Sequence, residues 1–192
     1  MNQLQFFALD LEFNQPSKRI IQVGLCLGAR NESPENFQCL KWYVDPGEPI
    51  SEPITALTGI TDDDIRTHAT PLPQVALEIG EALKARGSFV NPVVWGDGDA
   101  RSLLAAFAGN DILFPFFGHR SIDVKTLYVY LNIVLGRNAR GGLKSAMAQY
   151  KVKFEGEPHR ADVDAFNTLR LFFALLDRQS ALEDIRSKAQ SI

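Results

Sequence analysis

Two carboxylates near the N-terminus, Asp10 and Glu12, are the first candidates for chemistry in this sequence. They end an apolar run that begins at Phe6 and is typical of a strand buried on both faces. Side chains alternate along a strand, so these two acids point to the same side and repel each other unless a cation lies between them. Oxygen ligands of this kind suit Mg2+ or Mn2+. Taken alone, the pair also fits a strand that ends at the surface with two solvated acids.

Further acids occupy similar places later in the chain. Asp97 and Asp99 follow a second apolar segment, and Asp162 and Asp164 open an apolar helix just after His159. Residues two apart on a helix point about 200° away from each other, so only one acid of each pair can enter a shared site. The residues alone leave open which member of each pair does so.

Hydrophobic patterning predicts strands and helices mixed along one chain. The first three strands are close together and joined by short connections, which favours an antiparallel meander. The predicted strands cover residues 6–12, 19–27, 37–44, 89–95 and 121–124. The main predicted helices cover residues 73–86, 100–108, 127–134, 143–150, a stretch around 166–176 and a separate terminal helix at 180–188.

The acidic groups together resemble the motifs of the DEDDh 3'-5' exonucleases, a superfamily that includes the polymerase III proofreading subunit, RNase T and the exonucleases that trim histone mRNA and small RNAs. The matching segments are Phe7-Ala8-Leu9-Asp10-Leu11-Glu12, Leu57-Thr58-Gly59-Ile60-Thr61, Trp95-Gly96-Asp97-Gly98-Asp99 and His159-Arg160-Ala161-Asp162-Val163-Asp164. The similarity extends over nearly the whole chain. It implies an α/β, RNase H-like fold, with a mixed sheet of about five strands, the first three antiparallel, flanked by helices.

The resemblance also implies roles for the motif residues. Asp10 would bridge two Mg2+ ions, for which Mn2+ could substitute. Glu12 and Asp164 would complete the site of the ion on the nucleophile side, and Asp99 would hold the ion on the leaving-group side. His159 would take the proton from the attacking water, a task that suits an imidazole with an ordinary pKa of about 6.5.

The family's spacing selects Asp99 and Asp164 from the two pairs, which makes Asp97 and Asp162 capping or surface acids. Four further residues are candidate substrate contacts. They are Phe13, Leu57, Thr58 and Arg160. Phe13 could stack on the terminal nucleotide or simply pack in the core. Gly98 stands where the trimming exonucleases often carry an aromatic residue, which weakens any transfer of their substrate preference.

Length and composition favour one domain over residues 1–192, because 192 residues with 45% hydrophobic content can bury one substantial core. No stretch reaches the roughly 20 apolar residues of a membrane span, and no basic-then-apolar leader opens the chain, so a cytoplasmic location without membrane contact is expected. Cys26 and Cys39 lie in apolar strand-like segments, which favours two buried thiols in a reducing compartment over a disulfide.

Charge is distributed unevenly. Residues 119–160 hold eight Lys or Arg and three Asp or Glu, a net charge of +5, which leaves -8 for the rest of the chain. A polyanion should therefore meet this segment first.

The expected function is metal-dependent 3'-5' exonuclease activity on single-stranded nucleic acid with a free 3' end, with RNA favoured over DNA. The alternatives are a DNA exonuclease, a hydrolase of short oligoribonucleotides, and a non-catalytic nucleic-acid-binding module. The last class should show a broken set of metal ligands, whereas here the set is complete. The sequence does not identify a protein partner.

Overall fold

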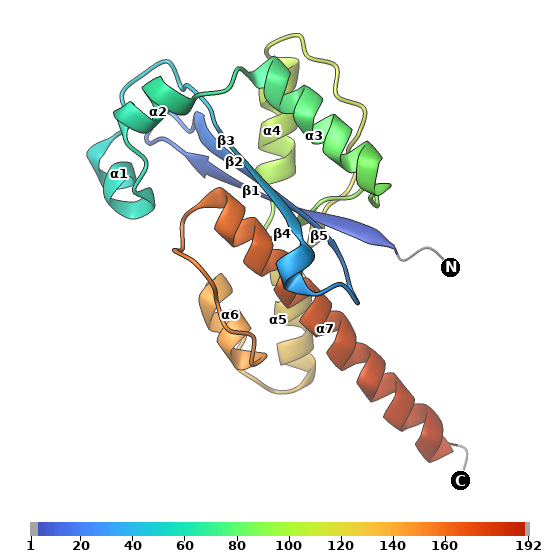
Figure 1. The fold of residues 1–192 in the computed structure, drawn as a ribbon. Coiled ribbons are helices and arrows are strands. Elements are labelled where there is room, and N and C mark those ends of the chain that lie inside the picture. The colour runs from blue at the N-terminus through green and yellow to red at the C-terminus, as the bar shows by residue number, and fades with distance from the viewer. Residues whose placement is uncertain (1–3, 191–192) are drawn as a thin grey trace.

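Five strands form one mixed sheet in the computed structural model, which describes residues 4–190. The strands are β1 (Gln5–Phe13), β2 (Ile20–Ala29), β3 (Gln38–Tyr43), β4 (Val93–Val94) and β5 (Ile122–Asp123). Their order across the sheet is β3-β2-β1-β4-β5 (Figure 1). The first three strands are antiparallel, whereas β4 runs parallel to β1 and β5 parallel to β4. The structure therefore confirms the predicted fold class.

Helices cover both faces of the sheet (Figure 1). They are α1 (Glu52–Thr58), α2 (Asp62–His68), α3 (Leu72–Arg86), α4 (Asp99–Ala108), α5 (Val124–Val134), α6 (Leu143–Gln149) and α7 (Ala161–Gln190), with a short 3-10 turn at Pro34–Asn36. One core cluster joins the sheet to α3 and α4, and a second joins its other face to α5, α6 and α7. No helix within residues 4–190 is both long enough and apolar enough to cross a membrane.

Two predicted elements differ from the structure. The fourth strand is not seven residues long but pairs only at Val93–Val94, directly after Pro92, which has no N–H to donate to a ladder. The two predicted C-terminal helices are one helix, α7, of 30 residues. Neither glycine nor proline occurs between residues 161 and 190, so nothing in the chain ends the first helix before the second begins.

The alternation of β1 decides where the acids lie. Phe7 and Leu9 pack into the cluster with α3 and α4, whereas Ala8 packs into the cluster with α7. Asp10 and Glu12 continue the series of Ala8, so they lie on the α7 side of the sheet. Both faces of the first strand therefore pack into a core, and the acids follow Ala8 on the face covered by α7.

The start of α7 lies directly on β2, next to these acids. Gly24, opposite Asp10 in the strand register, leaves the room for this contact, because a Cβ atom there would lie 2.0 Å from the carbonyl carbon of Ala161. The side chain of Gln22, fully buried, accepts a hydrogen bond of 2.8 Å from the backbone N–H of Ala161. These two residues of β2 fix the helix that carries Asp164.

The two cysteines form a disulfide, so the prediction of two buried thiols is wrong. Cys26 of β2 and Cys39 of β3 are direct partners in the antiparallel register, with their Cα atoms 4.0 Å apart. Cys39 is exposed on the edge strand. The two cysteines are 13 residues apart in the chain, and this spacing alone does not predict the disulfide. Their pairing depends on the register of β2 and β3, which the connection between the two strands sets.

Candidate active site

Asp10 is surrounded by other carboxylates at the end of β1. Burial raises its pKa well above the ordinary value, and the negative charges of Asp99, Glu12 and Asp164 raise it further, in that order. The four acids therefore lie close enough to act on one another, although they come from β1, α4 and α7. The charges of the other three predicted metal ligands all act on Asp10. Among the described residues, the group of ligand atoms within 4.8 Å of one another contains Glu12 and Asp164 but neither Asp10 nor Asp99.

Glu12 and Asp99 share this environment. Burial and then the charges of Asp164 and Asp99 raise the pKa of Glu12 to about 7, while Arg160 acts in the opposite direction. Burial raises the pKa of Asp99 to about 7 as well, with a contribution from Asp97. Carboxyl groups with such values hold protons near neutral pH unless a cation takes their place.

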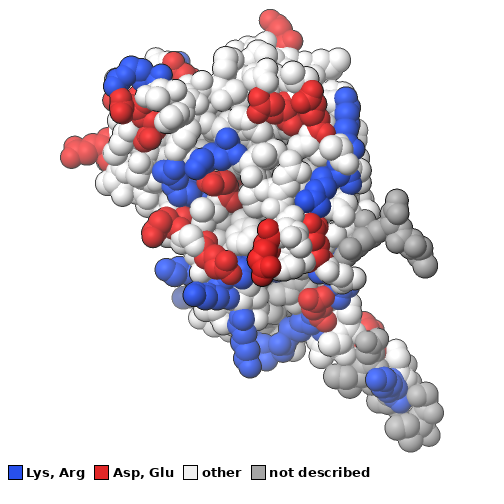
Figure 2. All heavy atoms as spheres, in the orientation of Figure 1, with Lys and Arg blue, Asp and Glu red and all other residues white. Residues whose placement is uncertain are grey.

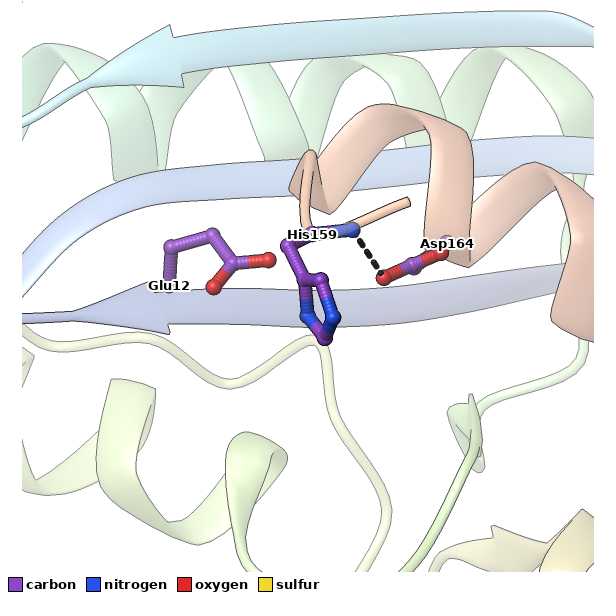
Figure 3. A group of neighbouring side chains, drawn as sticks. All are labelled: Glu12, His159 and Asp164. Carbon is purple, nitrogen blue, oxygen red and sulfur yellow. Dashed lines mark hydrogen bonds between the residues drawn. The ribbon is translucent and has the colours of Figure 1, made fainter. Parts of the chain in front are cut away.

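His159 lies between Glu12 and Asp164 (Figure 3). Ligand atoms of these three side chains all lie within 4.8 Å of one another. The backbone N–H of His159 donates a hydrogen bond of 3.0 Å to Oδ2 of Asp164, which opposes the rise that burial causes in the pKa of that carboxyl. His159 has a φ of 62°, a left-handed conformation that is uncommon for residues other than glycine.

The other acid of each pair points to a surface partner. Asp97 forms an ion pair with Arg101, four residues along, on the exposed side of α4. Asp162 lies 3.6 Å from the ammonium nitrogen of Lys41 on β3. Asp99, as the first residue of α4, and Asp164, in the first turn of α7, are the two that act on Asp10, as the family's spacing indicates.

Arg160 joins three parts of the chain beside the acids. Its guanidinium donates a hydrogen bond of 2.6 Å to the hydroxyl of Tyr43, and a longer one of 3.4 Å to the carbonyl of Thr58. The Thr58 side chain is buried and donates to the carbonyl of Ile54 in its own helix. Leu57, by contrast, is 52% exposed. Among Leu57, Thr58 and Arg160, Leu57 therefore has the side chain that is most accessible to a substrate.

Phe13 lies on the opposite side of the sheet from Glu12. It packs against the cluster of α3 and α4 and lines a cavity of about 630 Å3 with Arg19 and Ser102. Its predicted stacking on a nucleotide stays a prediction.

Sequence reasoning missed several residues that support the site. The apolar pattern places Gln22 and Gly24 within the second predicted strand and assigns them no further role, although a glycine inside a strand is a sign of a close backbone approach. Asp123 was not assigned a role either, and its carboxylate accepts hydrogen bonds of 2.9 Å from the backbone N–H groups of Gly96 and Lys125. It thereby joins the start of α5 to the loop before Asp99.

The arrangement fits a divalent-metal site. Its donors are mostly carboxylate oxygens, which hard divalent cations prefer. Burial is the largest cause of their raised pKa values, repulsion from neighbouring acids adds to it, and a bound cation would offset both. Three donors are already grouped within 4.8 Å.

Comparisons with known proteins agree with this geometry. The RNase T family model, described as exonuclease, matches residues 7–172. No curated protein matches the chain. Among solved structures, the nuclease domain of 3'hExo, described as a DEDDh family member bound to rAMP, is 19% identical, with a TM-score of 0.73 and coverage of 92% of this chain and 94% of that chain.

Two further structures share the fold. Cell-death related nuclease 4 (CRN-4) is 16% identical, with a TM-score of 0.76 over 91% of this chain and 64% of that chain. The zinc-bound E. coli ExoI–ssDNA complex is 16% identical, with a TM-score of 0.65 over 96% of this chain and 43% of that chain. With its motif acids gathered at one end of the sheet and the family match spanning residues 7–172, the chain belongs to the RNase T exonuclease family.

Proposed function

We propose that the chain removes nucleotides from the free 3' end of single-stranded nucleic acid, RNA in preference to DNA, by a two-metal mechanism with His159 as general base. The observation that carries this proposal is the convergence of Asp10, Glu12, Asp99 and Asp164 on one another, with His159 beside two of them. Mg2+ is the proposed metal, and Mn2+ can substitute for it.

Asp10, Glu12 and Asp164 would hold one ion, and Asp10 with Asp99 the other. When bound, the two ions supply an activated water, neutralise charge on the phosphorus oxygens and stabilise the leaving oxygen. The role of this chain's acids is to place that positive charge at the end of β1 and to keep it there. Their repulsion without metal gives the site its preference for a doubly charged partner.

His159 is suited to accept the proton of the attacking water. Its side chain is exposed, and its backbone is held by the Asp164 carboxylate. The imidazole therefore has a fixed anchor and free access to solvent, which a group that gains and then releases a proton at each turnover needs.

The substrate's terminal nucleotide would lie toward α1, where Leu57 is exposed and Arg160 holds the carbonyl of Thr58. The preference for RNA rests on the resemblance of two segments to the RNA-trimming exonucleases, Trp95-Gly96-Asp97 and Asp123-Val124-Lys125-Thr126-Leu127. Solved structures with this fold are described with rAMP, with a histone mRNA stem-loop and with ssDNA, so the fold is found with both RNA and DNA.

The test uses matched RNA and DNA single strands, labelled at the 5' end, with a 3'-hydroxyl or a 3' block, in Mg2+ or in chelator. We expect a ladder that shortens from the open 3' end, faster for RNA, and no product with the block or the chelator. Faster cleavage of DNA would favour the DNA exonuclease, and cleavage restricted to di- to pentanucleotides would favour the short-oligoribonucleotide hydrolase. Internal cuts, or binding without cleavage, would contradict the proposal.

A further inference from the structure

A groove adjoins the proposed catalytic residues on the side of α6. It has a volume of about 580 Å3 and is lined by His159 and Asp164 on one side and by Leu143, Lys144 and Phe154 on the other. This volume is within the range of about 300–1,000 Å3 that is usual for sites of small ligands. Because two lining residues belong to the proposed site, a group bound in this groove lies next to the reacting phosphodiester.

The lining of the groove combines a cation with apolar surface. The ammonium nitrogen of Lys144 lies 5.9 Å from the centre of the Phe154 ring, and Lys144 forms no ion pair with any acid among residues 4–190. Phe154 is half-buried and packs against the core beneath α7. A free ammonium beside an aromatic ring is suited to a phosphate and the base attached to it.

The two segments that flank the site differ in charge. Residues 45–68, here the α1–α2 segment, contain six Asp or Glu and one Arg, which forms an ion pair with Asp63 of the same helix. Residues 124–144, here the α5–α6 segment, contain four Lys or Arg and no Asp or Glu. Figure 1 shows the start of α7 between α1 and α6, and in Figure 2 Lys and Arg side chains gather on the lower left of the body, where α6 lies.

Charge therefore distinguishes the two ends of a bound strand. A terminal nucleotide has no further phosphate beyond it, so it can end against the α1–α2 segment without bringing more negative charge to those acids. The upstream part of the strand carries one phosphate for each nucleotide and needs cations along its path. The α5–α6 segment offers them.

We propose that the α6 groove binds the nucleotide on the 5' side of the scissile phosphodiester, with Lys144 at its phosphate and Phe154 against its base. The strand then enters over the α5–α6 segment, crosses the four carboxylates and ends toward Leu57. This inference rests on the proposed function and adds a second nucleotide subsite and a direction to it.

The test compares two substrates that differ only in the upstream part. A p-nitrophenyl ester of a nucleoside 5'-phosphate occupies the terminal position alone, whereas a tetranucleotide RNA also reaches the α6 groove. In Lys144→Gln, the ratio of kcat/KM for the tetranucleotide to kcat/KM for the ester should fall about three- to fivefold. In Phe154→Leu, which keeps apolar bulk but removes the ring, the ratio should fall about fivefold or more.

Lys153→Gln is the matched control, because Lys153 is an exposed lysine that does not line the groove and its substitution changes net charge equally. Its ratio should equal that of the parent. Lys144→Gln should also lower the slope of log affinity for single strands against log salt by about 0.7, the value for one lost phosphate contact. Thermal unfolding of each variant checks the fold, and Lys144→Gln carries the test if Phe154→Leu does not fold.

Unchanged ratios in Lys144→Gln and Phe154→Leu would overturn the subsite, and so would an equal fall in Lys153→Gln. A parent enzyme that cleaves neither substrate would contradict the exonuclease function itself. Failure of the subsite and failure of the function are therefore separate results.

Discussion

The α1–α2 segment and the α5–α6 segment flank the same acids but use their charged residues differently. Acids of the first segment serve its own structure: Asp64 and Thr61 form a capping box at α2, and Asp62 accepts a hydrogen bond of 2.7 Å from the backbone of Ile50. Another, Glu48, accepts a hydrogen bond of 2.8 Å from the side chain of Asn14.

The four cations of the α5–α6 segment make no such contacts. Within residues 4–190, none of these side chains donates a hydrogen bond to the protein. The loop before α6 is also rich in glycine, at Gly136, Gly141 and Gly142. The comparison shows that charge count alone does not identify a binding surface: charges already satisfied by the fold stabilise it, and charges left unpaired are available to a substrate.

The largest effect on activity is expected from the four carboxylates that lie between the two segments. Asp10→Asn should lower kcat/KM about 10³-fold or more on every substrate, because it removes the ligand proposed to bridge both ions. The melting temperature in chelator should stay equal or rise, since an amide cannot ionise and so avoids the cost of a negative charge at this buried position. Asp97→Asn is the control, with activity within about twofold of the parent. A strongly destabilised Asp10→Asn protein would contradict the account.

His159→Ala should lower kcat by about 10²-fold or more while leaving metal affinity nearly unchanged, because the imidazole acts on the water. Isothermal titration with Mn2+ and steady-state kinetics from pH 6 to 9 measure the two effects separately. If the variant kept the parent's turnover across that range, His159 would be a bystander.

Charge reversal sharpens the comparison between the two segments. Arg140→Glu should lower kcat/KM for a 20-nucleotide RNA about five- to tenfold at low salt, whereas Glu52→Lys should change it less than about twofold. Both differences should shrink in 0.5 M salt because ions screen exposed charges. If Glu52→Lys raised kcat/KM by the same factor by which Arg140→Glu lowered it, the bound strand would extend over both segments.

The smallest effect concerns stability without metal. The folded state raises the pKa of Glu12 and Asp99 to about 7, so these groups stabilise the fold at low pH, and that contribution is lost as pH rises through about 7. In chelator, the melting temperature should fall by a few degrees between pH 5 and 8. Excess Mg2+ should remove this fall by binding the deprotonated carboxylates. Identical pH profiles with and without Mg2+ would argue against a metal site at these acids.

Local pattern explains what the sequence could predict. The apolar run of β1 and its two acids lie within eight residues of each other, so alternation alone places Asp10 and Glu12 on one side. The motif spacing then selected Asp99 and Asp164, and both act on Asp10 in the folded chain. The single domain over residues 1–192 stays a prediction.

Contacts between distant elements could not be predicted. The approach of Ala161 to Gly24, the hydrogen bonds of Arg160 to Tyr43 and Thr58, and the pairing of the two cysteines all depend on how separate segments meet. Arg160 is a predicted substrate contact at the end of the basic segment 119–160. Its hydrogen bonds to the protein appear only once α1 and β3 are placed beside it.

The most direct test of the account is the path of the bound strand. A single-stranded RNA carrying 4-thiouridine at either the terminal or the fourth position from its 3' end is bound to the full chain in Ca2+, irradiated, and the crosslinked peptides are identified. We predict that the fourth position crosslinks within residues 124–154 and the terminal position near Leu57. The reverse assignment, or crosslinks from both positions to one segment, would contradict the account.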